Sequence, residues 1–157
     1  MIRKSMTFRA LPFLCILFAG CFLFSCKKDS PPEPDPVVDF RNYKLFNYSS
    51  GSEVESGSFK IEQLLNGNSR LTITINEPFR QKGVNFEALI NTRDAEDNEL
   101  VFSNLGMVNG ETGILVTDPV ISSGSNLPIK FTDLINKTGY YVKVMNGANV
   151  QATGVIR

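Results

Sequence analysis

The sequence lacks histidine and tryptophan, and its three cysteines all lie within the first 26 of its 157 residues. These absences exclude a histidine-based catalytic triad, a histidine metal site and a zinc ribbon. Cysteine is missing from residues 27–157, so that part of the chain cannot contain a disulfide. We therefore expect it to fold without a disulfide, a metal ion or a cofactor.

An excess of positive charge is also missing. The chain balances 16 Lys and Arg against 16 Asp and Glu. Three of the basic residues, Arg3, Lys4 and Arg9, lie within residues 1–26, which contain no acidic residue. Residues 27–157 therefore hold 13 basic and 16 acidic side chains. A mildly negative domain does not attract nucleic acid without specific contacts, so no nucleic-acid partner is expected.

The longest apolar run covers only residues 10–24, none of which is charged. As a helix it would rise about 22 Å, which is less than the hydrocarbon thickness of a bilayer at about 30 Å. A basic start followed by a short apolar run is typical of an export signal rather than a permanent membrane span.

The apolar run ends in Leu23-Phe24-Ser25-Cys26 and is followed by polar residues. This ending resembles the lipobox of bacterial lipoproteins, in which a signal peptidase cuts before a cysteine whose sulfur receives a diacylglycerol. The resemblance implies a signal peptide over residues 1–25, with Leu23 and Ser25 recognised by the peptidase. It also implies that Cys26 is lipidated and holds the protein on a membrane.

A second lipobox-like ending, Phe18-Ala19-Gly20-Cys21, ranks lower because cleavage there would leave an apolar stub over residues 22–24. A signal peptide cleaved elsewhere and an uncleaved anchor remain alternatives. Lys27 follows Cys26, and by resemblance to lipoprotein sorting in enteric bacteria this favours the outer membrane. The sequence does not indicate which face of that membrane the protein occupies.

Residues 26–36 form the predicted tether, with prolines at positions 31, 32, 34 and 36. Proline fixes φ and removes an amide donor, so neither a helix nor a sheet is expected here. An extended segment of this length spans roughly 30 Å.

Residues 37–157 have the size of one domain and show alternating apolar and polar residues rather than a helical stripe. In residues 70–76, for example, the apolar side chains occupy positions 71, 73 and 75. We predict strands over residues 43–48, 58–65, 70–76, 84–91, 100–105, 112–117, 140–145 and 150–156. Hairpin turns are expected at 66–68 and 146–149, and one helical turn over 131–137 with Thr132 as its N-cap. The predicted fold is an all-β, antiparallel immunoglobulin-like or Greek-key sandwich of about eight strands.

Residues 105–113 are similar to the Leu-x-x-Val-Asp/Asn-Gly-x-Thr-Gly stretch of CHRD (chordin-type) domains in bacterial lipoproteins. Residues 86–92, 141–145 and 150–156 also resemble segments of that family, in the same order. The resemblance spans roughly residues 43–157. It implies an exported β-sandwich without an established enzymatic activity.

The family's paired histidines fall on Glu87 and Leu89, and its later histidine falls on Met145. Imidazole is a good ligand for transition metals, whereas a leucine side chain offers no lone pair, so no such metal site is carried over. The alternate positions that face inward stay apolar, namely Phe86, Ala88 and Ile90.

Residues 93–99 form the densest polar cluster, in which Asp94, Glu96, Asn98 and Glu99 could offer oxygen ligands to calcium. The glycine and the spacing of an EF-hand loop are missing, so we predict a solvated loop between two strands. No nucleophile with a neighbouring base is visible, and the protein is not expected to be an enzyme.

Aromatic side chains supply two further expectations. Tyr140 and Tyr141 are adjacent strand residues, so one ring should face the core and the other the rim, where it could contact a partner or a sugar. The predicted loops at 106–111 and 122–128 contain Met107, Val108 and Leu127 but no aromatic ring.

The sequence thus predicts a lipid-anchored, non-catalytic interaction or accessory module of the cell envelope, with an unknown protein or glycan partner. A lipoprotein that binds small molecules or glycans is the alternative.

Overall fold

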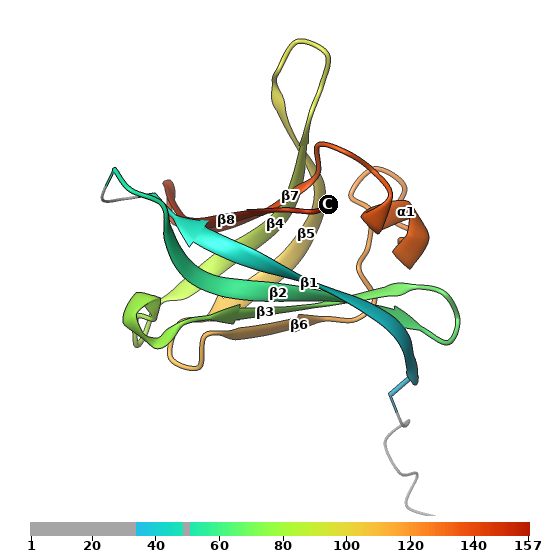
Figure 1. Cartoon of the computed structure of the whole chain (residues 1–157), viewed down its shortest axis with the longest axis horizontal. Helices are drawn as coiled ribbons and strands as arrows, with labels where there is room; N and C mark the ends of the chain where they lie inside the picture. The colour runs from blue at the N-terminus through green and yellow to red at the C-terminus, as the bar shows by residue number, and fades with distance from the viewer. Residues whose placement is uncertain (1–33, 49–50) are drawn as a thin grey trace, which may run out of the picture. The chain divides into compact units, whose positions relative to one another are not determined.

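The structure is a computed structural model that describes residues 34–48 and 51–157 (Figure 1). Pro34–Arg157 forms one compact unit with its own hydrophobic core. The predicted signal peptide, with Leu23 and Ser25, and the predicted lipidation site Cys26 lie outside the described residues. Within the described ranges, no helix has the length and apolar content of a membrane span.

Eight strands and two short helical segments make up the domain. The strands are β1 (Val37–Asn47), β2 (Val54–Leu64), β3 (Ser69–Ile75), β4 (Asn85–Arg93), β5 (Glu99–Asn109), β6 (Ile114–Thr117), β7 (Tyr141–Asn146) and β8 (Asn149–Val155). A 3-10 turn, η1 (Glu77–Phe79), follows β3, and the helix α1 (Phe131–Ile135) precedes β7.

All strand pairs are antiparallel, in the order β5-β4-β7-β8-β1-β2-β3-β6. The prediction of an all-β antiparallel fold of about eight strands is confirmed. The sheet is continuous, because β8 and β1 pair at Thr153 and Phe46 and so connect its two halves. It curls until its edge strands meet, and the Thr117 hydroxyl of β6 donates a 2.6 Å hydrogen bond to the Leu105 carbonyl of β5.

One hydrophobic core lies between the two halves of the sheet. The apolar positions that alternate along β3 face this core, as the sequence predicts. Leu71, Ile73 and Ile75 are all fully buried. On β4 the predicted inward residues Phe86, Ala88 and Ile90 are also fully buried, as expected. Tyr43, which is partly buried against this core, stacks on the buried Phe59 at 4.8 Å between ring centroids and connects β1 with β2.

Several predicted boundaries were wrong. β1 begins at Val37 rather than at residue 43, and β5 continues to Asn109, so the predicted loop at 106–111 is mostly strand. The cause in β5 is Gly106, whose φ of 106° accompanies an irregularity in the pairing with β4 and shifts the alternation. The helical turn is confirmed, but its N-cap residue is Lys130 and not Thr132. The turn η1 was not predicted.

The two ends of β1 define two ends of the domain. At its start, the Pro36 carbonyl accepts a 3.0 Å hydrogen bond from Leu65 N, and Asn66 donates to the Asp35 carboxylate at 2.7 Å. The last residues of the predicted tether therefore lie against the β2–β3 turn. The far end carries the β1–β2 connection, the β7–β8 turn and η1 (Figure 1).

Candidate functional site

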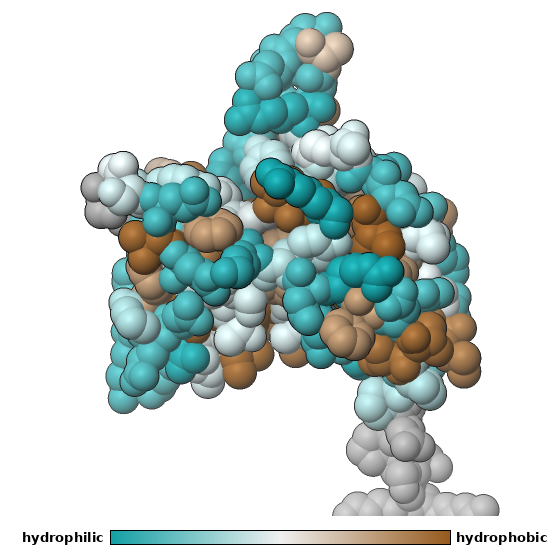
Figure 2. Space-filling model, viewed as in Figure 1, coloured by the Kyte–Doolittle hydropathy of each residue, from teal (hydrophilic) through white to brown (hydrophobic). Residues whose placement is uncertain are grey.

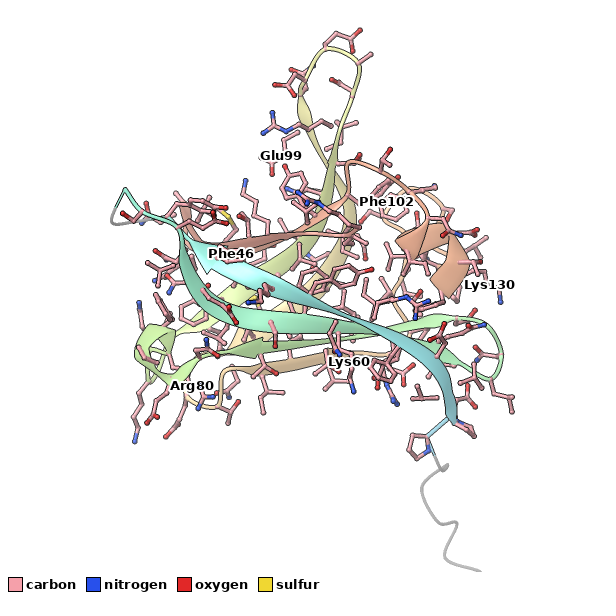
Figure 3. All side chains as sticks on the ribbon, viewed as in Figure 1. Phe46, Lys60, Arg80, Glu99, Phe102 and Lys130 are labelled. Carbon is pink, nitrogen blue, oxygen red and sulfur yellow. The ribbon has the colours of Figure 1, made fainter. Side chains whose placement is uncertain are left out.

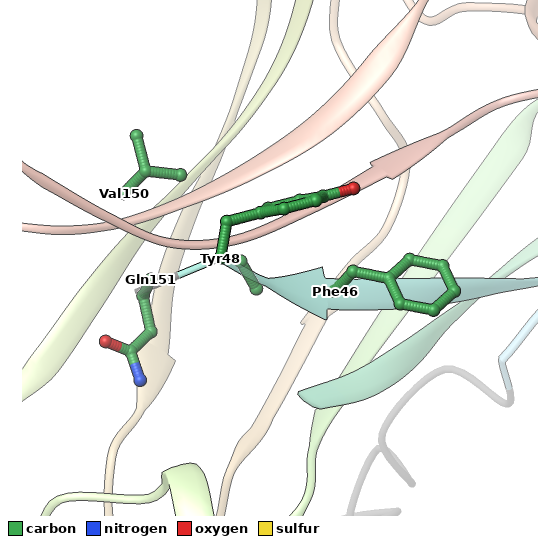
Figure 4. A pocket seen from close by; sticks show the side chains of 5 residues that line it. Phe46, Tyr48, Val150 and Gln151 are labelled. Atoms are coloured by element: carbon green, nitrogen blue, oxygen red, sulfur yellow. The ribbon is translucent and has the colours of Figure 1, made fainter. Parts of the chain in front are cut away.

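A surface depression of about 390 Å³ lies where β1 ends beside β8, and we name it the β1–β8 depression (Figure 4). Its lining is mainly apolar, with two aromatic rings and one amide. The lining residues are Phe46, Tyr48, Val150, Gln151 and Ala152.

The alternation of β1 creates this depression. Leu45 and Asn47 point inward and are buried, so the rings of Phe46 and Tyr48 stand on the outer surface. The Asn47 side-chain amide donates a 2.6 Å hydrogen bond to the Gln151 carbonyl and holds the end of β1 against β8. Tyr48 is 55% exposed, so one of these rings is open to a partner.

A second hollow of about 360 Å³ shares Phe46 and Tyr48 with the first and adds polar groups. Among them is Glu53, whose carboxylate accepts a 3.2 Å hydrogen bond from the Tyr48 hydroxyl. An aromatic face bordered by hydroxyl, amide and carboxylate groups can stack against a sugar ring or pack against a peptide side chain.

The most connected polar cluster surrounds Glu99, which is labelled in Figure 3. Both of its carboxylate oxygens accept hydrogen bonds from Lys143 Nζ at 2.8 Å, and Tyr141 donates a third at 2.7 Å. Asn91, which is buried, donates a fourth. These donors from Lys143, Tyr141 and Asn91 lower the pKa of Glu99 from 4.5 to about 2.

Glu99 is therefore ionised at neutral pH, and both of its carboxylate oxygens accept hydrogen bonds from neighbouring side chains. A carboxylate with so low a pKa is a weak base at neutral pH, so Glu99 is poorly suited to act as a general base. The cluster connects β4, β5 and β7. Sequence reasoning considered Glu99 only as a calcium ligand and did not associate it with these partners.

Residues 94–98 form the loop that connects β4 to β5, which confirms a loop between two strands. The Asp94 carboxylate accepts hydrogen bonds from the backbone amides of Glu96 and Asn98 at 3.0 and 2.8 Å. Bonds from the side chain and backbone of Asn98 lower the pKa of Asp94. Over the described ranges, no group of three or more acidic, histidine or cysteine side chains could hold a metal ion, so no calcium site is found there.

The structure does bring together the three positions that the CHRD resemblance aligned with histidines. Glu87 on β4 pairs with Met145 on β7, and Leu89 on the same outward side pairs with Lys143. Glu87 is exposed and lies 3.5 Å from the side-chain amide of Asn104. A carboxylate, a thioether and an alkyl chain do not form a set of ligands for a transition metal.

The two adjacent tyrosines divide as predicted. Tyr140 packs edge-on against Phe102 at 4.7 Å beside the core, while Tyr141 faces outward toward Glu99. In the predicted loops at 106–111 and 122–128, Met107 and Leu127 are exposed but Val108 is buried. The alternation over residues 43–48 could have identified Phe46 and Tyr48 as outward rings, but they were not selected as site residues.

No protein-family model, curated protein or solved structure matches the chain. Function is therefore inferred from the residues themselves, and the β1–β8 depression is the feature that best fits a binding role.

Proposed function

We propose that this protein is a lipid-anchored, non-catalytic module of the bacterial cell envelope that binds a partner through the β1–β8 depression. Cys26 carries the lipid, and the outer membrane is the membrane that Lys27 favours. The lipobox resemblance and the proline-rich tether support the anchor. The resemblance of residues 43–157 to CHRD domains supports an exported β-sandwich module.

One observation carries the binding role: Phe46 on β1 and Tyr48, the residue directly after β1, stand on the outer surface while Leu45 and Asn47 beside them are buried. An exposed tyrosine next to a strand that is held in the sheet offers a large contact area and loses little side-chain entropy on binding. A protein partner fits the apolar lining of Phe46, Val150 and Ala152.

A glycan is the second candidate partner. Tyr48 supplies an exposed ring face, and Glu53 and Gln151 lie beside it with groups that can bind sugar hydroxyls. Binding of a panel of purified cell-surface glycans to residues 34–157 would favour this candidate, and loss of that binding in Tyr48→Ser would assign it to the depression.

The lipid anchor is tested by metabolic labelling with an alkyne analogue of palmitate. Cys26→Ala should lose the label and accumulate the unprocessed precursor, while the matched variant Cys21→Ala should keep both label and processing. Labelling of Cys26→Ala at the wild-type level would contradict the anchor.

The binding surface is tested by placing a photo-crosslinking amino acid at Tyr48 in living cells. A matched control replaces Val116, which is equally exposed but lies on β6. We expect a discrete crosslinked product only from position 48. Tyr48→Ser should weaken binding of the isolated partner by roughly 30-fold, the effect of losing an aromatic hot spot worth about 2 kcal/mol. Equal crosslinking from both positions would contradict the assignment.

A further inference from the structure

The start of β1 carries an exposed apolar surface, which we name the apolar end. Val38, Phe40 and Leu65 are each more than half exposed, and Val37 beside them is 39% exposed. Figure 2 shows hydrophobic atoms gathered at this end of the domain, at the lower right. Exposed apolar clusters of this kind mark contact with another apolar phase or molecule.

Strand pairing places the two segments that carry these side chains next to one another at one end of the domain. Val37 pairs with Leu64, the neighbour of Leu65, and the Leu65 amide is bonded to Pro36. Phe40 follows three residues along β1. The cluster is therefore built on backbone that is held by hydrogen bonds.

Charged side chains near the apolar end are mostly paired with one another. Arg41 contacts Asp39 at 2.8 Å, and Lys60 contacts the Glu62 carboxylate at 2.6 Å beside the Phe40 position. Lys130 Nζ donates to the Asn66 carbonyl at 3.0 Å at the β2–β3 turn. This end is nearly neutral, so it suits an apolar phase better than a strongly charged partner.

The short segment between Cys26 and Pro34 limits the distance between the apolar end and a membrane that holds Cys26. Eight peptide units join Cys26 to Pro34, and fully extended they span at most about 28 Å. A short tether raises the effective concentration of the second contact to roughly millimolar. If Cys26 is lipidated, even a weak affinity of the apolar end for lipid would hold it against the bilayer.

We propose that the apolar end, formed by Val37, Val38, Phe40 and Leu65, inserts into the interfacial region of the bilayer that anchors Cys26. This inference rests on the lipid anchor of the proposed function and adds an orientation to it. β1 runs about 30 Å from the apolar end to the β1–β8 depression, so this contact would direct the depression away from the lipid.

Because no cysteine follows Cys26 in the sequence, a dye can be attached to a single introduced cysteine. The lipidated protein is reconstituted in vesicles of phosphatidylethanolamine and phosphatidylglycerol, with one new cysteine that carries an environment-sensitive dye. We expect blue-shifted emission that brominated lipids quench for Val38→Cys and Leu65→Cys. The control Val150→Cys, at the far end, should show neither effect.

Two outcomes of the vesicle experiment would overturn the proposal. One is unshifted emission at positions 38 and 65 in protein that is demonstrably anchored in the vesicles. The other is an equal shift at positions 38, 65 and 150, because a directed contact must distinguish the two ends of β1. A shift in whole envelopes that is missing in lipid vesicles would show that a protein covers the apolar end, and it would also overturn the lipid contact.

A second arm separates this inference from the lipid anchor itself. Pro34–Arg157, which contains the complete core, is held on nickel-chelating vesicles by a histidine tag before residue 34. The same probes should shift, whether or not Cys26 is the natural lipid site. The double variant Phe40→Asp and Leu65→Asp should reduce the inserted fraction by tenfold or more, since roughly tenfold is expected for each large apolar side chain. Unchanged urea unfolding of this variant would show that it folds, and unchanged insertion would overturn the proposal.

Discussion

Lys143 and Glu99 lie on strands that are not neighbours, and their ion pair crosses β4, which separates β7 from β5. Lys143 Nζ is 2.8 Å from both carboxylate oxygens. Asn91 on β4 and Tyr141 on β7 donate to the same carboxylate. One acidic side chain therefore connects three strands on the outer surface of the sheet.

The first prediction concerns the pH dependence that this carboxylate gives to stability. The lowered pKa of Glu99 in the folded protein means that its contribution is present above about pH 4.5 and is lost as the pH falls toward 2. Because the side chain is 35% exposed, solvent screening limits the effect to about 1–2 kcal/mol. Glu99→Gln should lower the free energy of urea unfolding by that amount at pH 7, and the difference should shrink toward pH 2.

Glu111→Gln is the matched control for this measurement. Glu111 pairs with Lys82 at 3.3 Å, but both side chains are well exposed, so its loss should change stability by less than about 0.5 kcal/mol. A difference between wild type and Glu99→Gln that stays constant from pH 7 to pH 2 would contradict the role assigned to Glu99.

The second prediction concerns Glu62, whose side chain is only 7% exposed. Burial raises its pKa, but hydrogen bonds from Arg70 and Lys60 outweigh burial and hold the pKa below its usual range. Arg70→Met removes the 2.9 Å partner and leaves the carboxylate poorly compensated, which should cost about 2–4 kcal/mol of unfolding free energy. The double variant Glu62→Met and Arg70→Met should be more stable than Arg70→Met alone. The exposed pair offers the control Arg41→Met, which should change little.

The third prediction concerns the Tyr43 hydroxyl. It is buried and has no hydrogen-bond partner among residues 34–48 and 51–157, and burial raises its pKa. Tyr43→Phe keeps the stacking on Phe59 and removes an unsatisfied group, so stability should stay equal or rise by up to about 1 kcal/mol. Phe59→Leu, which loses the stacked ring, should instead be destabilising in the same thermal melts. Strong destabilisation by Tyr43→Phe would indicate that the hydroxyl has a partner.

The fourth prediction is that folding needs neither a disulfide nor a metal ion. Residues 27–157 contain no cysteine, and in the described part no acidic cluster is arranged around a metal. Pro34–Arg157 should therefore unfold in one cooperative transition whose midpoint is unchanged by reductant or by chelator. A midpoint that falls on addition of a chelator would reveal a bound ion that stabilises the folded state.

Local alternation explains which parts of the fold could be predicted. Strands such as β3 and β4 bury every second residue, so both their existence and their faces follow from the sequence. The first residues of β1 lack that signal, because Val37, Val38 and Phe40 remain exposed and the strand is defined by pairing with β2. In β5 the irregularity at Gly106 interrupts the period and hides the second half of the strand.

The site was harder to predict than the fold. The Glu99 cluster depends on the register that sets Asn91 opposite Tyr141, and such pairings between distant segments leave no local pattern. Phe46 and Tyr48 could be assigned to an outer face from alternation. Their position beside Val150 and Gln151 depends on the contact between β1 and β8, which the sequence does not reveal.

The last prediction tests that contact. A Cβ added at Gly154 on β8 would stand 2.3 Å from the Lys44 carbonyl oxygen and 2.7 Å from the Phe59 ring. Neither the β1 backbone nor a buried ring can move away easily, so Gly154→Ala should cost about 2–3 kcal/mol. For a domain of this size the melting temperature should fall by roughly 10 °C.

Gly124→Ala is the matched control, since the nearest atom to its added Cβ is the Ser122 hydroxyl at 4.0 Å. Its melting temperature should stay close to that of the wild type. If Gly154→Ala also melted like the wild type, β8 could not approach β1 as closely as the structure places it. The β1–β8 depression depends on that approach, so the same melt would also remove the basis for assigning partner binding to Tyr48.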